Sequence, residues 1–356
     1  MKIETLLPLG KLDPGLARPE SPLDLHAVGA DAALVDQLGY DSLLMEETKD
    51  DPFAVLAIAA QQTRRVHVGT SVAIAFARSP YVTAMSAWTA QKLSGGRFEL
   101  GLGSQVRGHI RRRFGLEWHP PGPWMRDYVR AVRAIWHSWQ HEQLLDFSSQ
   151  HYALNLSVPL FTPDPIAHPA IPVQVAAVNP YMIGVAAEVA DGVRLHPVCS
   201  ARYINDLVHP TTAAKRPDDA PFEICLKPLV AAGPNEAVLN QRRETARQRL
   251  AFYVSTPAYR GAFDRYGLND LADELAVLSK SQRWNDMAAR IDDDTLDQWV
   301  ISATYEQLAA AVQTRFAGLI DRIELSIPVG SANEQEQLRE IVAAIQTLPG
   351  SGFGAD

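Results

Sequence analysis

Cysteine is scarce in this chain, which has only two, Cys199 and Cys225, among 356 residues. Two thiols cannot build a disulfide framework, and no metal-ligand spacing surrounds them. We therefore expect both to be reduced in a cytoplasmic protein. Long hydrophobic runs are also missing, since no segment approaches the roughly 20 apolar residues that a membrane helix needs. The first residues run directly into a strand-like segment, 3–7, so we expect no signal peptide.

Basic residues are also fewer than acidic residues. The chain carries 33 Lys and Arg against 41 Asp and Glu, a formal net charge of -8. This balance argues against general binding to nucleic acid or to a membrane surface. The sequence has no H-E-x-x-H, no C-x-x-C and no Walker P-loop, and we expect no metal site. Gly184 lies in a helical stretch and completes no dinucleotide fingerprint, which leaves a Rossmann fold without support.

What the chain does contain is an alternation of strand and helix patterns. The expected strands are 3–7, 42–45, 66–74, 98–102, 173–176, 192–196, 222–230 and 322–327. Most are separated by amphipathic helical segments, two of which are expected to begin at the capping residues Asp51 and Ser79. The sequence therefore predicts one (β/α)₈ barrel, a TIM barrel, over 1–348. A doubly wound sheet alternates in the same way, so the pattern alone leaves that fold open. The glycine-rich end, 349–356, is expected to be a flexible tail.

Two segments exceed the minimal barrel. Residues 144–155 read as a short β-hairpin before the fifth strand, and 234–304 form a long insertion between strands seven and eight. Long insertions at the carboxyl ends of barrel strands often build or cover an active site. A packing or dimer element is the alternative reading of these segments.

Several motifs fall in a fixed order along the predicted barrel. They include L-G-Y-D-S-L-L-M-E-E-T at 38–48, G-T-S-V at 69–72, K-L-S-G-G-R-F-E-L-G-L-G-S at 92–104 and P-V-Q-V-A-A-V-N-P at 172–180. In order and spacing the chain resembles the luciferase-like flavin and deazaflavin oxidoreductases. It is most similar to their branch that uses coenzyme F420, a 5-deazaflavin. The resemblance covers nearly the whole chain and implies the luciferase-like form of the TIM barrel.

The resemblance also implies a set of cofactor contacts. Relatives place a non-proline cis peptide where Ser71–Val72 stands, with an apolar side chain behind the deazaflavin ring; an ordinary buried strand is the alternative. Their cofactor phosphate lies in the loop that matches 176–179, which also reads as a plain strand-to-helix turn capped by Asn179. The expected cofactor-binding residues are Ser71, Val72, Gly103, Ser104, Gln105, His109, Ala176, Ala177, Val178 and Asn179.

Arginines follow the glycine loop at 107, 111, 112 and 113. Coenzyme F420 carries a phosphodiester and a glutamate tail, and guanidinium groups suit such an anion. The alternative is a solvated helix face. FMN, the alternative cofactor, has one phosphate and no glutamate tail, so these arginines favour F420.

Candidate catalytic residues are Glu47 and Thr48, which end the second strand beside the expected reactive ring carbon. Many relatives have a histidine where Thr48 stands, and this departure puts histidine-based proton transfer in doubt. Glu47 is the nearest remaining acid, and a buried carboxylate can act as an acid or a base. It can equally serve as a hydrogen-bond acceptor. His196, which ends the sixth strand, can line the substrate end or be a wall residue.

The sequence therefore predicts an F420-dependent oxidoreductase that transfers a hydride between the deazaflavin and a small organic substrate. An FMN-dependent luciferase-like monooxygenase or flavin reductase is the alternative. A non-catalytic flavin- or deazaflavin-binding protein is the alternative of another class. The family also implies a homodimer formed through barrel helices, on which Trp88, Trp136 and Trp139 are large apolar side chains. The same tryptophans can instead belong to the core.

Overall fold

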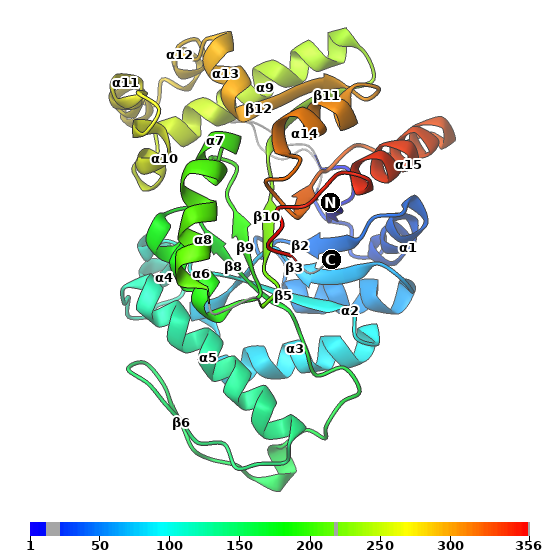
Figure 1. The fold of residues 1–356 in the computed structure, drawn as a ribbon, viewed down its shortest axis with the longest axis vertical. Coiled ribbons are helices and arrows are strands. Elements are labelled where there is room, and N and C mark those ends of the chain that lie inside the picture. The colour runs from blue at the N-terminus through cyan, green and yellow to red at the C-terminus, as the bar shows by residue number, and fades with distance from the viewer. Residues whose placement is uncertain (12–21, 217–219, 355–356) are drawn as a thin grey trace.

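The structure is a computed structural model that describes residues 1–11, 22–216 and 220–354. Parallel strands form a closed barrel in the order β3-β2-β1-β13-β10-β9-β8-β5, and β3 pairs with β5 to complete the ring. The barrel strands are β1 (Lys2–Leu6), β2 (Ser42–Met45), β3 (His67–Thr70), β5 (Phe98–Gly103), β8 (Val173–Ala177), β9 (Gly192–Leu195), β10 (Glu223–Leu226) and β13 (Arg322–Glu324). The predicted (β/α)₈ barrel is thus confirmed (Figure 1).

Helices surround the barrel: α1 (Val28–Leu38), α2 (Pro52–Gln62), α3 (Pro80–Ser94), α4 (Arg107–Arg112), α5 (Pro121–Gln140), α6 (Pro180–Val189), α7 (Ala201–Tyr203), α8 (His209–Lys215), α14 (Leu308–Phe316) and α15 (Ala332–Gln346). Several begin at the expected caps. The Asp51 side chain accepts hydrogen bonds from the first turn of α2, and Ser79 accepts one from Val82 N in α3. The tryptophans at 88, 136 and 139 are buried in the core, so they are not free to form a dimer surface.

The expected strand 222–230 is wrong as a single element. It divides into β10 and β11 (Leu229–Gly233) around Pro228, which has no amide hydrogen to continue the ladder. β11 leaves the barrel and pairs in parallel with β12 (Val300–Thr304).

Between these two strands lies the long insertion. It contains α9 (Glu236–Val254), α10 (Arg260–Asp264), α11 (Asn269–Lys280), α12 (Trp284–Ala288) and α13 (Asp293–Trp299). These helices gather at one end of the molecule, together with β11 and β12 (Figure 1). The insertion therefore has a small sheet and helical layer of its own.

The expected strand 66–74 is interrupted. β3 ends at Thr70, the Ser71–Val72 peptide is cis, and β4 (Ala73–Ile74) then pairs with the end of β5. The cis peptide expected from the resemblance is therefore present. The interruption turns residues 71–72 out of the regular ladder at the carboxyl end of the barrel.

The remaining segments lie at the edges of the barrel. The expected hairpin is confirmed as β6 (Phe147–Ser148) paired with β7 (Ala153–Leu154), which projects from the end of the molecule opposite the insertion (Figure 1). The chain end makes contacts as far as Phe353, whose carbonyl accepts a hydrogen bond from Phe222 N, while residues 355–356 lie outside the described part. No helix in the described residues is long and apolar enough to cross a membrane.

Candidate active site at the carboxyl end of the barrel

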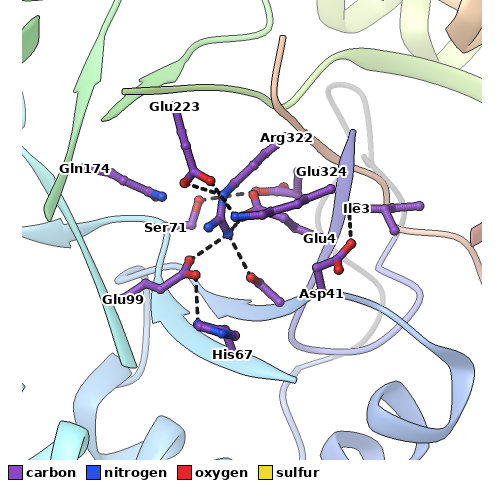
Figure 2. A network of polar contacts seen from close by, with 12 residues as sticks. Ile3, Glu4, Asp41, His67, Ser71, Glu99, Gln174, Glu223, Arg322 and Glu324 are labelled. Carbon is purple, nitrogen blue, oxygen red and sulfur yellow. Dashed lines mark hydrogen bonds and ion pairs between the residues drawn. The ribbon is translucent and has the colours of Figure 1, made fainter. Parts of the chain in front are cut away.

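Charged side chains fill the interior of the barrel (Figure 2). Glu4 of β1 accepts hydrogen bonds from Arg194 of β9 at 2.5 Å and from Arg322 of β13 at 3.0 Å. Arg322 also binds Glu99 at 3.0 Å and Glu223 at 2.7 Å. Burial alone would raise the pKa of Glu99, but Arg322 and His67 outweigh it and lower that pKa to about 2. Arg194 and Arg322 thus join Glu4, Glu99 and Glu223 in one ion-pair network.

The network extends to the carboxyl end of the barrel through Ser71. Its hydroxyl donates to Glu324 at 3.2 Å and accepts from Arg194 Nε at 3.2 Å. Glu324 also lies 3.2 Å from Lys227, and Lys227 binds Glu46 at 2.8 Å. Ser71 is therefore anchored from inside the barrel by groups that come from β9 and β13.

Sequence reasoning missed this network. Its signal was present as single charged residues within otherwise apolar strands, at Glu4, Glu99, Arg194, Arg322 and Glu324. A reading by hydrophobic periodicity counts the apolar neighbours and treats each such charge as an exception. Charges in four different parallel strands, which are buried on both faces, instead indicate a polar barrel interior.

Val72 lies directly against Gly103. A Cβ atom at Gly103 would stand 2.5 Å from Val72 Cγ2, and one at Gly101 would stand 2.0 Å from the Thr70 carbonyl oxygen. Both glycines are therefore needed for the close approach of β5 to the interrupted strand. The result is an apolar side chain supported from behind at the carboxyl end of the barrel.

Glu47 and Thr48, the candidate catalytic residues, follow β2. The Glu47 carboxylate binds Arg78 at 2.6 Å and accepts a hydrogen bond from Ile74 N at 2.7 Å. It therefore fixes β4 next to Val72. Thr48 is exposed, and its carbonyl oxygen accepts a hydrogen bond from Arg113 at 3.1 Å. This contact places the arginine segment beside the end of β2.

The loop after β5 carries Ser104, Gln105 and His109. Gln105 has a φ of 54°, a left-handed conformation that is uncommon outside glycine. His109 is exposed on α4, as are Arg107, Arg111 and Arg112. The Arg107 guanidinium lies 5.2 Å from the Trp118 ring centroid. These arginines form an exposed basic segment next to the glycine loop.

The expected phosphate loop, 176–179, is shorter than predicted, because Ala176 and Ala177 belong to β8 and only Val178 and Asn179 connect that strand to α6. The Asn179 side chain accepts a hydrogen bond from Met182 N at 2.9 Å and so caps α6. Val178 O accepts one from the Tyr203 hydroxyl at 2.8 Å. β8 pairs with β5 at Leu102–Val175, which brings this loop next to the glycine loop.

The predicted site residues therefore follow four neighbouring positions of the barrel: β2, the β3–β4 interruption, β5 and β8. His196 follows β9, the strand that pairs with β8 on its other side. Its ring stacks on Tyr259 with a centroid distance of 4.2 Å and meets the edge of Tyr253 at 4.8 Å. Both tyrosines come from the insertion, and no sequence motif marked them.

This arrangement matches a known family. The family model for the luciferase-like monooxygenases matches residues 6–322. The chain belongs to the luciferase-like monooxygenase family. An uncharacterized protein of Mycobacterium tuberculosis is 38% identical over 315 residues, covering 87% of this chain and 92% of that protein. The family therefore accounts for the barrel and for the order of its motifs.

Two further comparisons concern F420-dependent proteins. A provisionally named coenzyme F420-dependent oxidoreductase of Mycobacterium tuberculosis is 28% identical over 357 residues, covering 93% of this chain and 96% of that protein. The F420-dependent tetrahydromethanopterin reductase of Methanopyrus kandleri has the same fold, with a TM-score of 0.70 at 16% identity. That match covers 97% of this chain and 98% of the reductase. The luciferase-like fold is thus shared with F420-dependent enzymes.

The site residues fit a deazaflavin. Val72 offers an apolar side chain next to Gly103, the amino end of α6 follows β8 after two residues and can bind a phosphate, and the exposed arginines of α4 can bind an anionic tail. Among the described residues, no group of three or more His, Cys, Asp or Glu is arranged to hold a metal ion.

Proposed function

We propose that this luciferase-like enzyme is an F420-dependent oxidoreductase that acts on a small organic substrate in the cytoplasm. The observation that carries the proposal is the convergence of three features on neighbouring strands: Val72 backed by Gly103, the small-residue loop before α6, and the arginines of α4. The proposal is supported by a similar protein and by an enzyme of the same fold that are both described as F420-dependent. When bound, the coenzyme supplies a carbon centre that gives or takes a hydride.

The residues then have distinct proposed roles. Val72 and Ser71 support the ring, Ala176, Ala177, Val178 and Asn179 hold its phosphate, and the loop of Gly103, Ser104, Gln105 and His109 contacts the remainder of the cofactor. Glu47 and Thr48 stand beside the reacting carbon. Glu47, held by Arg78 and Ile74 N, can accept a hydrogen bond there, while Thr48 can donate or accept one. Orientation and exclusion of water are the protein's contribution.

Equilibrium titration of the purified protein with F420 and with FMN tests the choice of cofactor. We expect the wild type to bind F420 more tightly than FMN. In the Arg111→Ala and Arg112→Ala variants we expect a smaller difference between the two affinities, because FMN has no glutamate tail for these arginines to bind. Arg339→Ala changes a half-buried arginine of α15 and is the matched control. Tighter binding of FMN by the wild type would instead favour a monooxygenase or flavin reductase.

A binding protein without turnover is the proposal's rival from another class, favoured by Thr48 at the position of the relatives' histidine. Screening the protein with oxidised and reduced F420 against alcohols, enones and imines separates the two. Spectral turnover with any of them removes the binding-only alternative.

We also propose a homodimer. Exposed apolar side chains cluster around the hairpin segment, with exposed fractions of 84% at Leu144, 75% at Leu156, 85% at Leu160 and 68% at Phe161. Apolar surface of this kind is typical of an interface. Light scattering across a wide concentration range tests the proposal, and a constant particle of 39.1 kDa contradicts it.

A further inference from the structure

His196 lies at the carboxyl end of the barrel and is not one of the proposed cofactor contacts. It directly follows β9, at the end of the barrel where TIM-barrel enzymes place their reactive groups. Its ring is fixed on one face by Tyr259 and at the edge by Tyr253, and those two rings pack edge-on at 5.7 Å. The insertion therefore supplies a rigid aromatic wall that sets the orientation of this imidazole.

The hydrogen bonding of His196 assigns its tautomer. Val198 N donates to Nδ1 at 3.3 Å, so Nδ1 is the acceptor and the proton of the neutral ring is on Nε2. Burial, together with the positive charges of Lys227 and Arg249, lowers the pKa of His196 to about 3. Nε2 has no hydrogen-bond partner among the described residues. The ring is therefore a neutral donor with a free N–H.

His196 belongs to the same end of the barrel as the cofactor residues. Lys227, whose charge acts on the imidazole, lies 3.2 Å from Glu324, and Glu324 accepts a hydrogen bond from Ser71. Ser71 precedes Val72, the proposed support of the ring. Contacts thus run from Lys227, whose charge acts on the histidine, to the residue that precedes the proposed ring support.

We propose that His196 is a substrate-binding catalytic residue whose Nε2–H donates a hydrogen bond to the oxygen of a carbonyl or alcohol substrate. This inference rests on the proposed F420-dependent function and names its substrate class. In the reducing direction the carbonyl carbon gains a hydride from the reduced coenzyme, and the electron pair of the C=O π bond moves to the oxygen. That oxygen then takes a proton from water, so the carbonyl becomes an alcohol while the coenzyme is oxidised.

His196 keeps its own proton throughout this step. A fixed donor stabilises the negative charge that grows on the oxygen and requires no reorganisation at the moment of reaction. The same donor cannot hydrogen-bond to the nitrogen of an iminium substrate, which has no free electron pair. The geometry therefore favours carbonyl and alcohol substrates over iminium ions.

Two substitutions at His196 distinguish the effect of its N–H donor from the effect of its planar ring. His196→Phe keeps a planar ring between the tyrosines and removes the N–H. His196→Gln places an amide N–H close to the position of Nε2. His137→Phe, at an exposed position on α5, is the matched control. Each variant is first titrated with F420 and melted, so that cofactor binding and folding are known before the substrate is tested.

The decisive readout is the infrared carbonyl stretch of ¹³C=O-labelled cyclohexanone bound to the complex with oxidised F420, in which no hydride is available. We expect a lower frequency in wild type, His137→Phe and His196→Gln than in His196→Phe. With reduced F420, we expect kcat to fall about 100-fold in His196→Phe, the size typical of losing one oxyanion donor.

An unchanged stretch and rate in His196→Phe overturn the inference. So does a wild-type F420 complex that binds none of cyclohexanone, butanone and acetaldehyde. Failure of the wild type to bind F420 rejects the proposed function itself, an outcome that the initial titration distinguishes from the other two.

Discussion

At the scale of single residues, Val72 leaves no room for a Cβ atom at Gly103. The alternation of strands and helices predicted where both residues lie, and the family resemblance predicted the cis peptide between Ser71 and Val72. The atomic reason for Gly103 was not predictable, because it depends on a side chain from another strand. Glycines that end strands are common, and only the structure shows which of them has no room for a Cβ atom.

Gly103→Ala should therefore affect both stability and binding. The added methyl carbon would lie 2.5 Å from Val72 Cγ2 and would force Val72 to move. Overpacking of this kind costs about 1–3 kcal/mol of stability. If Val72 supports the cofactor ring, F420 affinity should also fall, by roughly tenfold or more for a lost contact of about 1.4 kcal/mol. Urea unfolding and F420 titration measure the two effects.

Gly261→Ala is the matched control for that change. A Cβ atom at Gly261 has no neighbour within 4 Å, and the residue lies within α10. We expect this variant to be as stable as the wild type or slightly more stable, because alanine has a higher helix propensity than glycine. Equal stability losses in the two variants would contradict the packing argument.

At the scale of elements, the first residues of helices were the most predictable features. Asp51, Ser79 and Asn179 were each expected to cap a helix, and each side chain accepts a hydrogen bond from its first turn. Such caps are visible in sequence because they depend on a few adjacent residues. The departure of β11 from the barrel was missed, since its partner β12 lies about 70 residues further along the chain.

Asn179 provides a test at this scale because its cap stands at the proposed phosphate loop. Asn179→Ala should cost about 0.5–2 kcal/mol of stability through loss of the bond to Met182 N. It should also weaken F420 binding, since the same loop presents its amides to the phosphate. Thermal melting and titration on one sample give both numbers.

Asn235→Ala supplies the comparison, because Asn235 caps α9 through Val238 N at 3.0 Å but lies in the insertion. This variant should lose similar stability and keep its F420 affinity. If both variants bind F420 as the wild type does, the loop before α6 does not hold the phosphate.

At the scale of the whole molecule, the barrel is held partly by charge. Burial alone would raise the pKa of Glu46, but Lys227 and Lys11 lower it to about 2, and Glu99 is lowered to about 2 against Arg322. In the unfolded chain both carboxyls have the ordinary value of 4.5. Their contribution to stability is therefore fully present above about pH 4.5 and is lost as the pH falls toward 2.

Glu324 acts in the opposite direction. Burial raises the pKa of Glu324, so its ionised form lowers stability at neutral pH, and acid relieves that cost. We expect the wild type to lose stability between pH 4.5 and pH 2.5 in urea unfolding. Glu46→Gln should show a shallower decline over that interval, and parallel curves would show that the Glu46 ion pairs contribute nothing measurable.

The ion pairs inside the barrel also bear on how the protein is made. Glu4 stands almost at the start of the chain, and its partner Arg322 is 318 residues away. Until β13 is translated, Glu4 has only Arg194 as its guanidinium partner, and Glu99 lacks the guanidinium of Arg322. Only after β13 has emerged can Glu4, Glu99 and Glu223 receive their shared guanidinium. Closure of the barrel therefore waits for the translation of β13, and a nascent chain stopped before Arg322 should remain a client of chaperones.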